Sequence, residues 1–339
     1  MKDRTIRIVT NFEGLGDVVP DGSGVELIAA AASDGEFLRQ CRRSDLVIID
    51  DDPRRLTLAC ILRPFFGFRL VSVDLILRRR KGVRGRLARA AKRALLSRVD
   101  KFLLYFKNIR SYHELYGIDP DRVSYVPFKV NGWEQASLWP ENPPEGDYVL
   151  CAGRSLRDVE TFISAMRQAG CPGILLQQPP KILEAHGTSV GPSELPPNLR
   201  RVVVETDSHE TFLGFIAGAR MVVIPRFRGD IASTGISTYL MAMAMRKCVI
   251  LSRGPGAEDL LTDQAVLVEP EDPAELAGQI ARLWDDNELR SQIAARGRRY
   301  AELLGGDRRL LSDVLRESLL CLGEKARLRA DAAITSRSG

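Results

Sequence analysis

The stretch MVVIPRFRGDIASTGISTYLMAMAMRKCVIL, residues 221–251, decides the fold. It begins with an apolar run at 221–225, passes through small and polar residues at 230–235, and continues as a helical stretch at 236–245. A second apolar run follows at 248–251. Short apolar runs on either side of a helical stretch are typical of strands that are covered on both faces of a parallel sheet. The stretch therefore predicts a strand–helix–strand unit of an α/β fold.

The same alternation runs through the whole chain, whose 339 residues favour about two domains. It also predicts a helix at the alanine-rich residues 25–32. Prolines and glycines interrupt the alternation in a segment typical of a linker. We expect an α/β chain of two Rossmann-like domains whose parallel sheets face each other across a cleft. The expected parts are an N-terminal Rossmann-like domain at 1–131, a hinge at 132–147, a C-terminal Rossmann-like domain at 148–304, and a C-terminal helix and tail at 305–339.

The composition excludes several classes of protein. Hydrophobic residues make up 45% and charged residues 27% of the chain, as in ordinary globular proteins. The six cysteines form no CxxC pair and none of the three histidines lies near a cysteine pair, so we expect no metal site. Residues 6–10 read as a strand rather than a signal peptide, and no uncharged apolar run approaches the roughly 18–20 residues of a membrane span. We expect a cytoplasmic protein, either free or peripheral on the inner face of the membrane.

Two loops of the C-terminal half carry the candidate binding residues, because ligands of open parallel sheets bind beyond the carboxyl ends of the strands. After the predicted strand 148–152, Gly153 allows a sharp turn, and Arg154 and Arg157 are suited to pair with a phosphate. At 230–235, small residues before a helix leave backbone N–H groups open to an anion. The alternatives are solvated surface arginines and a plain helix cap.

The first strand-to-helix crossing, at residues 11–17, contains Gly14 and Gly16 and is expected at the cleft. It is not a GxGxxG sequence, so a dinucleotide-dependent oxidoreductase is poorly supported. The acidic residues 50–52 follow a predicted strand. Because neighbouring side chains on an extended chain point to opposite sides, we interpret them as a strand-end turn rather than a metal site.

The run LMAMAMRKCVI at residues 240–250 resembles the LEAMACGKPVI signature of GT-B glycosyltransferases of the group 1, or family 4-like, superfamily. Further motifs keep the family's order over residues 148–303, among them the Gly153-Arg154 turn and the stretch 272–277. The resemblance is weaker in the N-terminal domain. It implies sugar transfer, retaining or inverting, from a nucleotide-sugar on the C-terminal domain to an acceptor on the N-terminal one.

The resemblance further implies a hexosyltransferase that needs neither a metal nor a bound cofactor, because basic side chains and a helix N-terminus neutralise the leaving diphosphate. The nucleotide-sugar is then a co-substrate. The residues that the resemblance places on the diphosphate are Gly153, Arg154, Arg157, Ser233, Thr234 and Gly235.

The chain departs from the family at several positions, among them the usual glycine, which is Arg246 here. The glutamate that holds the ribose corresponds to Met241, and a second glutamate corresponds to Ser233. The N-domain histidine of many members has no counterpart, and Asp74 stands near that slot as the candidate catalytic base. A surface or capping role is the alternative for Asp74. A catalytically silent GT-B scaffold that binds a partner is the alternative for the whole chain.

A basic segment lies between Asp74 and Asp100, with ten basic residues and no acidic one. Apolar residues recur at helical spacing within it, which is typical of a membrane-surface helix. Nucleic acid is not an expected partner, because no aromatic residues interleave with the charges; a solvated helix face is the alternative. We therefore expect transfer to a glycan or lipid-linked acceptor at an anionic membrane surface, as in polysaccharide biosynthesis. The expected membrane-binding residues are Arg79, Arg80, Lys81, Arg86, Arg89, Lys92 and Arg93.

Overall fold

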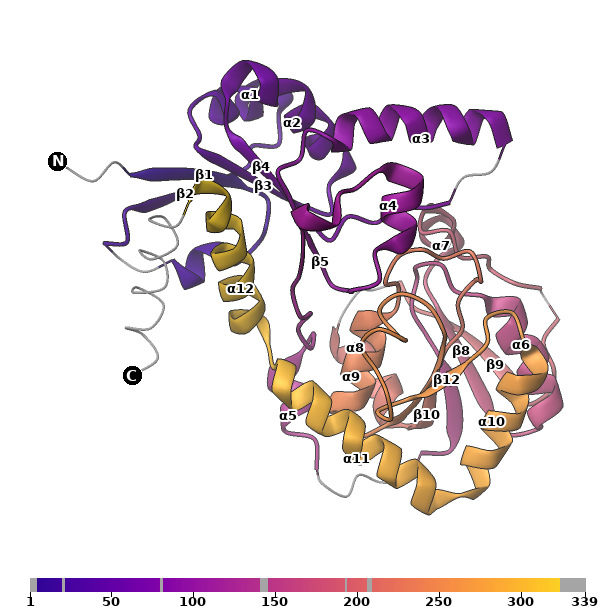
Figure 1. Ribbon diagram of the computed structural model, residues 1–339. Coiled ribbons are helices and arrows are strands. Elements are labelled where there is room, and N and C mark those ends of the chain that lie inside the picture. The colour runs from indigo at the N-terminus through magenta and orange to yellow at the C-terminus, as the bar shows by residue number, and fades with distance from the viewer. Residues whose placement is uncertain are drawn as a thin grey trace. The chain divides into compact units, whose positions relative to one another are not determined.

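The computed structural model describes residues 5–19, 22–79, 82–140, 146–192, 194–205 and 209–323. The chain forms two compact units, shown in Figure 1. The first consists of Met1–Pro127 together with Asp307–Gly339, and the second of Phe128–Gly306. The described part of the expected hinge therefore belongs to the second unit, where it carries the short helix α5 (Trp133–Ser137). The helix after residue 306 belongs to the first unit.

The first unit contains a six-stranded, wholly parallel sheet in the order β2-β1-β3-β4-β5-β6. The central strands are mostly buried, and β3 has four consecutive buried apolar residues at 46–49, as the sequence predicts for strands covered on both faces. The strands are β1 (Ile6–Thr10), β2 (Val25–Ala29), β3 (Leu46–Asp50), β4 (Arg69–Val73), β5 (Lys101–Leu104) and β6 (Val123–Tyr125). The helices are α1 (Asp34–Arg42), α2 (Pro53–Phe66), α3 (Gly82–Leu96), α4 (Arg110–Tyr116) and α12 (Asp307–Leu319), with 3-10 turns η1 (Leu15–Val18), η2 (Pro120–Arg122) and η3 (Leu320–Leu322).

The helix predicted at 25–32 is wrong. Residues Val25–Ala29 form β2, which pairs in parallel with Ile6–Thr10 along its whole length. The alanines favour a helix locally, but pairing with the neighbouring strand outweighs that preference, because strand formation depends on tertiary context more than helix formation does.

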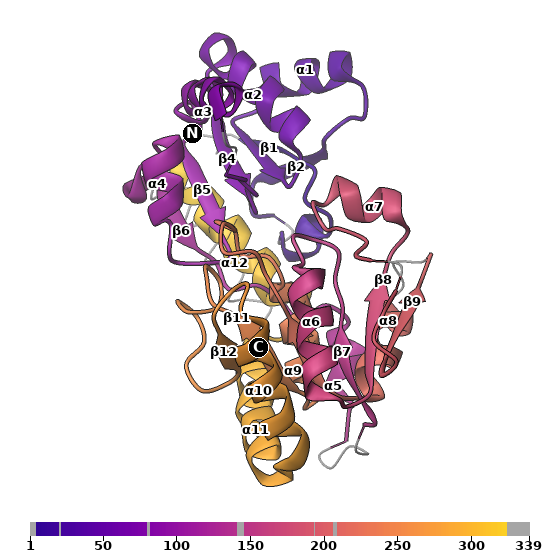
Figure 2. The ribbon, with the colours of Figure 1, turned by 90° about the vertical axis from the view of Figure 1, so that its right-hand side faces the viewer.

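The second unit contains another six-stranded parallel sheet, in the order β12-β11-β10-β7-β8-β9. Helices α6 and α10 pack against each other on this unit (Figure 2), and their apolar faces enclose its core with the central strands. The strands are β7 (Tyr148–Cys151), β8 (Gly173–Gln177), β9 (Leu199–Val203), β10 (Ala219–Ile224), β11 (Cys248–Ser252) and β12 (Val266–Val268). The helices are α6 (Val159–Ala169), α7 (Pro180–Ala185), α8 (His209–Ala217), α9 (Ile236–Ala244), α10 (Pro273–Asp285) and α11 (Asn287–Leu304).

The strand–helix–strand prediction for residues 221–251 is confirmed, since β10, α9 and β11 follow one another there. Every residue of α9 except Ser237 is buried. The α/β prediction with two parallel sheets is confirmed as well. In the second sheet the strand order reverses between β7 and β10, so the loops that follow these two strands start side by side at the position where open parallel sheets bind ligands.

Candidate functional site

The loops after β7 and β10 are joined to each other. Arg157 and Arg226 form an isolated antiparallel bridge, and the backbone N–H of Asp158 donates to the carbonyl of Pro225 at 3.1 Å. The Asp158 carboxylate caps α6 by accepting from the N–H of Thr161, as its position in the sequence suggests. The two loops predicted to bind a ligand are therefore one connected structure at the carboxyl edge of the second sheet.

Arg157 lies inside this structure and not on its surface. Arg157 is only 3% exposed. Its guanidinium donates to the carbonyls of Ala152 at 3.0 Å and Ser155 at 2.8 Å. A third contact reaches the hydroxyl of Thr238 in α9 at 3.4 Å. Burial lowers the pKa of Arg157 to about 10, and the positive charge of Arg226 adds to that effect. Arg157 thus joins the loop after β7 to the first turn of α9.

Two glycines make room for Arg157. Gly153 has a φ of +106°, and a Cβ there would lie 2.5 Å from a guanidinium nitrogen of Arg157. Gly235, the N-cap of α9, has a φ of +97°, and a Cβ there would lie 3.4 Å from the same nitrogen. The guanidinium therefore packs directly against the N-terminus of α9.

The N-terminus of α9 has no side-chain cap within the described chain, because Gly235 has no side chain. The neighbouring Thr234 hydroxyl donates to Asp230 at 2.5 Å instead of capping the helix. The helix dipole places a partial positive charge at this end. The charged guanidinium of Arg157 and the positive end of α9 thus lie together, an arrangement that favours a bound anion.

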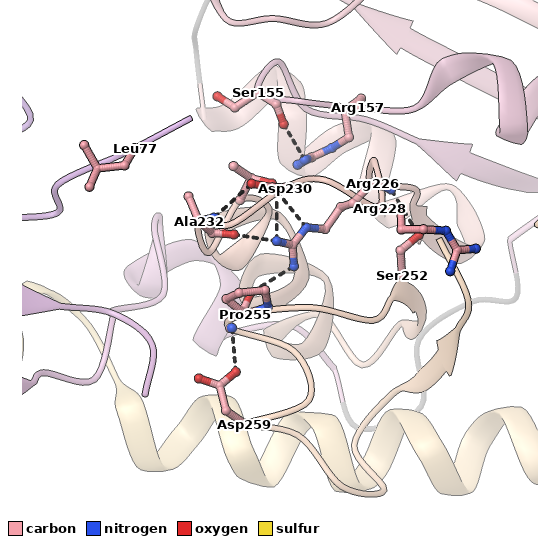
Figure 3. A network of polar contacts seen from close by, with 12 residues as sticks. Leu77, Ser155, Arg157, Arg226, Arg228, Asp230, Ala232, Ser252, Pro255 and Asp259 are labelled. Carbon is pink, nitrogen blue, oxygen red and sulfur yellow. Dashed lines mark hydrogen bonds and ion pairs between the residues drawn. The ribbon is translucent and has the colours of Figure 1, made fainter. Parts of the chain in front are cut away.

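A second buried arginine fixes the shape of the loop after β10 (Figure 3). Arg226 and the side chain of Asp230 are each 1% exposed, and the ion pair between them is 2.8 Å long. Arg226 also donates to the carbonyls of Pro255, at 2.9 Å, and Ala232. Its backbone N–H donates to the hydroxyl of Ser252. Arg226 therefore connects the loop after β10 to the loop after β11.

Sequence reasoning missed Arg226. The signal that points to it is a buried strand followed at once by an arginine, with an aspartate four residues later and glycine at 229 and 254. Gly254 lies against the Arg226 guanidinium and has a φ of +137°, a backbone conformation that favours glycine. Asp230 forms its ion pair with Arg226. Arg157 is therefore a buried cation without an ion pair among the described residues.

The other predicted residues of this unit are spread more widely. The side chain of Arg154 is exposed, while its carbonyl accepts from the Thr188 hydroxyl at 2.6 Å. Ser233 is half-buried beside Gly256. Met241, in the expected ribose slot, is buried within α9, and the Ser237 hydroxyl contacts its sulfur at 3.8 Å.

In the first unit, three carboxylates converge at the carboxyl edge of the sheet. Asp74 follows β4, Asp50 is the last residue of β3, and Asp51 follows it. Burial and the charges of Asp50 and Asp51 raise the pKa of Asp74 to about 8. The buried Tyr105, after β5, has its pKa raised well above its usual range by burial and then by Asp74. Asp74 therefore lies among groups that favour its protonated form below about pH 8.

The expectation that the acidic residues 50–52 would not converge assumed an extended chain. Asp51 has a φ of +34°, so the chain turns there at the end of the strand, as expected, and Asp52 caps α2 by accepting from the N–H of Arg55. Asn11 holds this strand end from the loop after β1, since its carboxamide pairs with both the N–H and the carbonyl of Asp50, at 2.8 and 2.7 Å. Within the described ranges, no cluster of three or more histidine, cysteine, aspartate or glutamate side chains is suited to hold a metal ion.

The loop with Gly14 and Gly16 forms the turn η1. Gly14 has a φ of +75°, and a Cβ there would lie 3.3 Å from Leu311 of α12, whereas Gly16 is exposed with open space around it. The expected membrane-binding residues differ in exposure. Arg79, Arg86 and Arg93 are exposed, Arg89 and Lys92 are half-buried, and Arg80 and Lys81 lie outside the described residues.

Comparison with known proteins agrees with this geometry. Residues 147–286 match the family model of the group 1 glycosyl transferases. Among solved structures, HepE from Anabaena in complex with UDP and glucose is 14% identical, with a TM-score of 0.65 over 93% of this chain and 99% of that one. Sucrose-phosphate synthase from Thermosynechococcus elongatus is 16% identical, with a TM-score of 0.63 over 94% and 90% of the two chains.

A third similar structure is WaaG, a glycosyltransferase involved in lipopolysaccharide biosynthesis. It is 15% identical, with a TM-score of 0.59 over 95% of this chain and 92% of that one. No curated protein sequence matches the chain. None of the described helices combines the length and the apolar character that crossing a bilayer requires.

Proposed function

We propose that this chain, which has the GT-B fold and whose residues 147–286 match the family model of the group 1 glycosyl transferases, moves a hexosyl group from a nucleotide-sugar to a glycan or lipid-linked acceptor at the cytoplasmic membrane surface. Arg157 is the residue that best supports the binding of a nucleotide-sugar. It is a buried cation with no ion pair in the described chain, and it packs against the uncapped N-terminus of α9.

The charged guanidinium and the positive end of α9 lie together in a buried place, which is electrostatically unfavourable, and a diphosphate bound beside them would reduce that cost. The N–H groups of the first turn of α9 supply hydrogen-bond donors for the phosphate oxygens. The side chain of Arg154 is exposed on the same loop. These groups would stabilise the negative charge that develops on the leaving diphosphate, without requiring a metal ion.

We assign the proton-accepting role to Asp74. In the transfer, the acceptor oxygen bonds to the anomeric carbon while the bond from that carbon to the diphosphate oxygen breaks, and the hydroxyl proton goes to a base. With a pKa of about 8, the carboxylate form of Asp74 that accepts the proton increases as the pH rises towards 8, and a general base is most effective when its pKa lies near the working pH. Its position after β4 lies at the carboxyl edge of the sheet, where ligands bind in parallel sheets.

The printed properties of two similar proteins support the choice of substrates. HepE binds UDP and glucose, and WaaG acts in lipopolysaccharide biosynthesis. A uridine diphosphate sugar and a saccharide acceptor on a lipid are therefore the first substrates to test.

Thermal-shift screening over nucleoside diphosphates and nucleotide-sugars tests the donor half. At least one of them should raise the melting temperature, and Arg157→Met and Arg154→Ala should each reduce the ligand-induced rise. Arg167→Met, an exposed arginine on α6, is the matched control and should leave the rise unchanged. If no nucleotide shifts the wild-type protein, the donor site is wrong. Turnover of a nucleotide-sugar by purified protein, lost in Asp74→Asn, would separate an enzyme from a silent scaffold.

A further inference from the structure

Helix α3 turns its apolar side outward. The buried residues of this helix are Gly85 and Leu96. On the opposite side, Val83 is 63% and Leu87 68% exposed, and Ala90, Ala91 and Ala94 are exposed with them. Positions 83, 87, 90 and 94 lie on one stripe of a helix with 3.6 residues per turn. A surface helix ordinarily buries such a stripe, so the outward orientation calls for a partner.

Arginines border this stripe on both sides. At 100° per residue, Arg84 and Arg86 lie on opposite flanks of the line through Val83 and Leu87, and both are exposed. The helix contains no acidic residue. Large exposed apolar residues also lie on the neighbouring α2, where Phe65 is 79% exposed.

Contacts with α4 hold α3 on the first unit, and Figure 1 shows the helix along the rim of that unit. The segment before it is held by two tyrosines of α4, since Tyr112 donates to the carbonyl of Leu75 and Tyr116 to that of Arg78, each at 2.6 Å. Farther along, the side chain of Arg93 lies over Gly117, where a Cβ would be only 2.5 Å from it. The outward stripe is therefore a fixed feature of the unit.

We propose that the outer face of α3, defined by Val83, Leu87, Ala90, Ala94, Arg84 and Arg86, docks this protein on an anionic lipid bilayer. The apolar stripe enters the boundary between headgroups and acyl chains, and the two arginines pair with lipid phosphates. A second copy of the chain does not fit, because two such faces carry only like charges. Nucleic acid does not fit either, because α3 has no aromatic side chain on which bases could stack.

This inference deepens the proposed action at a membrane surface and can be tested apart from it. Flotation of the full chain uses vesicles of neutral lipid alone or of neutral lipid mixed with an anionic phospholipid. The protein should bind the anionic vesicles at low salt and bind less as salt rises. Arg86→Gln should weaken partitioning about fivefold, and Leu87→Asn about tenfold or more.

Leu138→Asn is the matched control, because Leu138 is an even more exposed leucine on the second unit. Its partitioning should equal that of the wild type. The proposal is overturned if anionic vesicles do not bind at low salt, or if Leu87→Asn binds as well as Leu138→Asn. The thermal shift with nucleotide is measured on the same variants, so a failure of docking is distinguished from a failure of the proposed transfer.

Discussion

The substitution Asp230→Asn examines whether the buried pair with Arg226 holds the loop after β10. Both side chains are 1% exposed, so removing the carboxylate charge leaves a buried guanidinium without its counter-charge. Breaking a buried pair in this way costs about 3–5 kcal/mol. Arg226 keeps its carbonyl partners at Pro255 and Ala232, and the amide keeps an oxygen to accept from the N–H of Ala232. We therefore expect about 3 kcal/mol, the lower end of that range.

Tryptophan fluorescence during urea unfolding measures this cost. The three tryptophans, at 133, 139 and 284, all lie in the second unit, so the signal reports the unfolding of that unit. Glu258→Gln is the control, because the pair of Glu258 with Arg253 is 3.6 Å long and more than 40% exposed on both sides. Its loss should cost less than about 1 kcal/mol. An equal effect of the two substitutions would refute the structural role assigned to Asp230.

Three further predictions address single positions. Gly235→Ala places a Cβ 2.9 Å from Ile224 at a φ of +97°, so calorimetry should show weaker binding of the nucleotide that screening identifies, whereas Gly229→Ala, with open space around it, should bind normally. The folded chain keeps a proton on Asp74 up to about pH 8, which the unfolded chain releases near pH 4. This stabilisation is full below about pH 4 and is lost as the pH rises through about 8, so Asp74→Asn should flatten that part of the profile of urea midpoint against pH. Arg298→Met removes donors to the carbonyls of Ala136, Ser137 and Ala244, and should lower the free energy of unfolding of the second unit by roughly 3 kcal/mol in the tryptophan assay.

The sequence predicted the elements whose signals are local and strong. The apolar runs that flank residues 236–245 could only be strands of a covered sheet, and the structure has them as β10 and β11. The predictions failed where contacts with residues distant in the sequence determine the secondary structure. Residues 25–29 become a strand because β1 pairs with them. The segment at 133–137 becomes a helix in the second unit, where Trp133 packs against Arg298 and Gly306, and no local pattern shows those partners.

The same distinction applies to the candidate site. The rule for parallel sheets singled out the loops with Arg157 and Gly235 because both follow predicted strands, whereas their adjacency depends on a strand order that only the structure shows. The direction of each side chain was not predictable. Arg154 and Arg157 look equivalent in sequence, yet one is exposed and the other is buried by two glycine turns. The pair of Arg226 and Asp230 escaped notice because the burial of a charge depends on loops that close over it.

The two positions where the resembling family has glutamates, Ser233 and Met241, affect the charge of the candidate site in the same way. With Ser233 and Met241 in place of glutamates, neither position adds a negative charge beside α9. The buried carboxylate of Asp230 is already paired with Arg226, and that of Asp158 caps α6. Under the proposed function, a diphosphate therefore meets Arg157 and the helix N-terminus without competition from a protein carboxylate. A ribose at the slot of Met241 meets a buried thioether, which is a weak acceptor. Binding energy would accordingly come from the diphosphate rather than from the ribose hydroxyls.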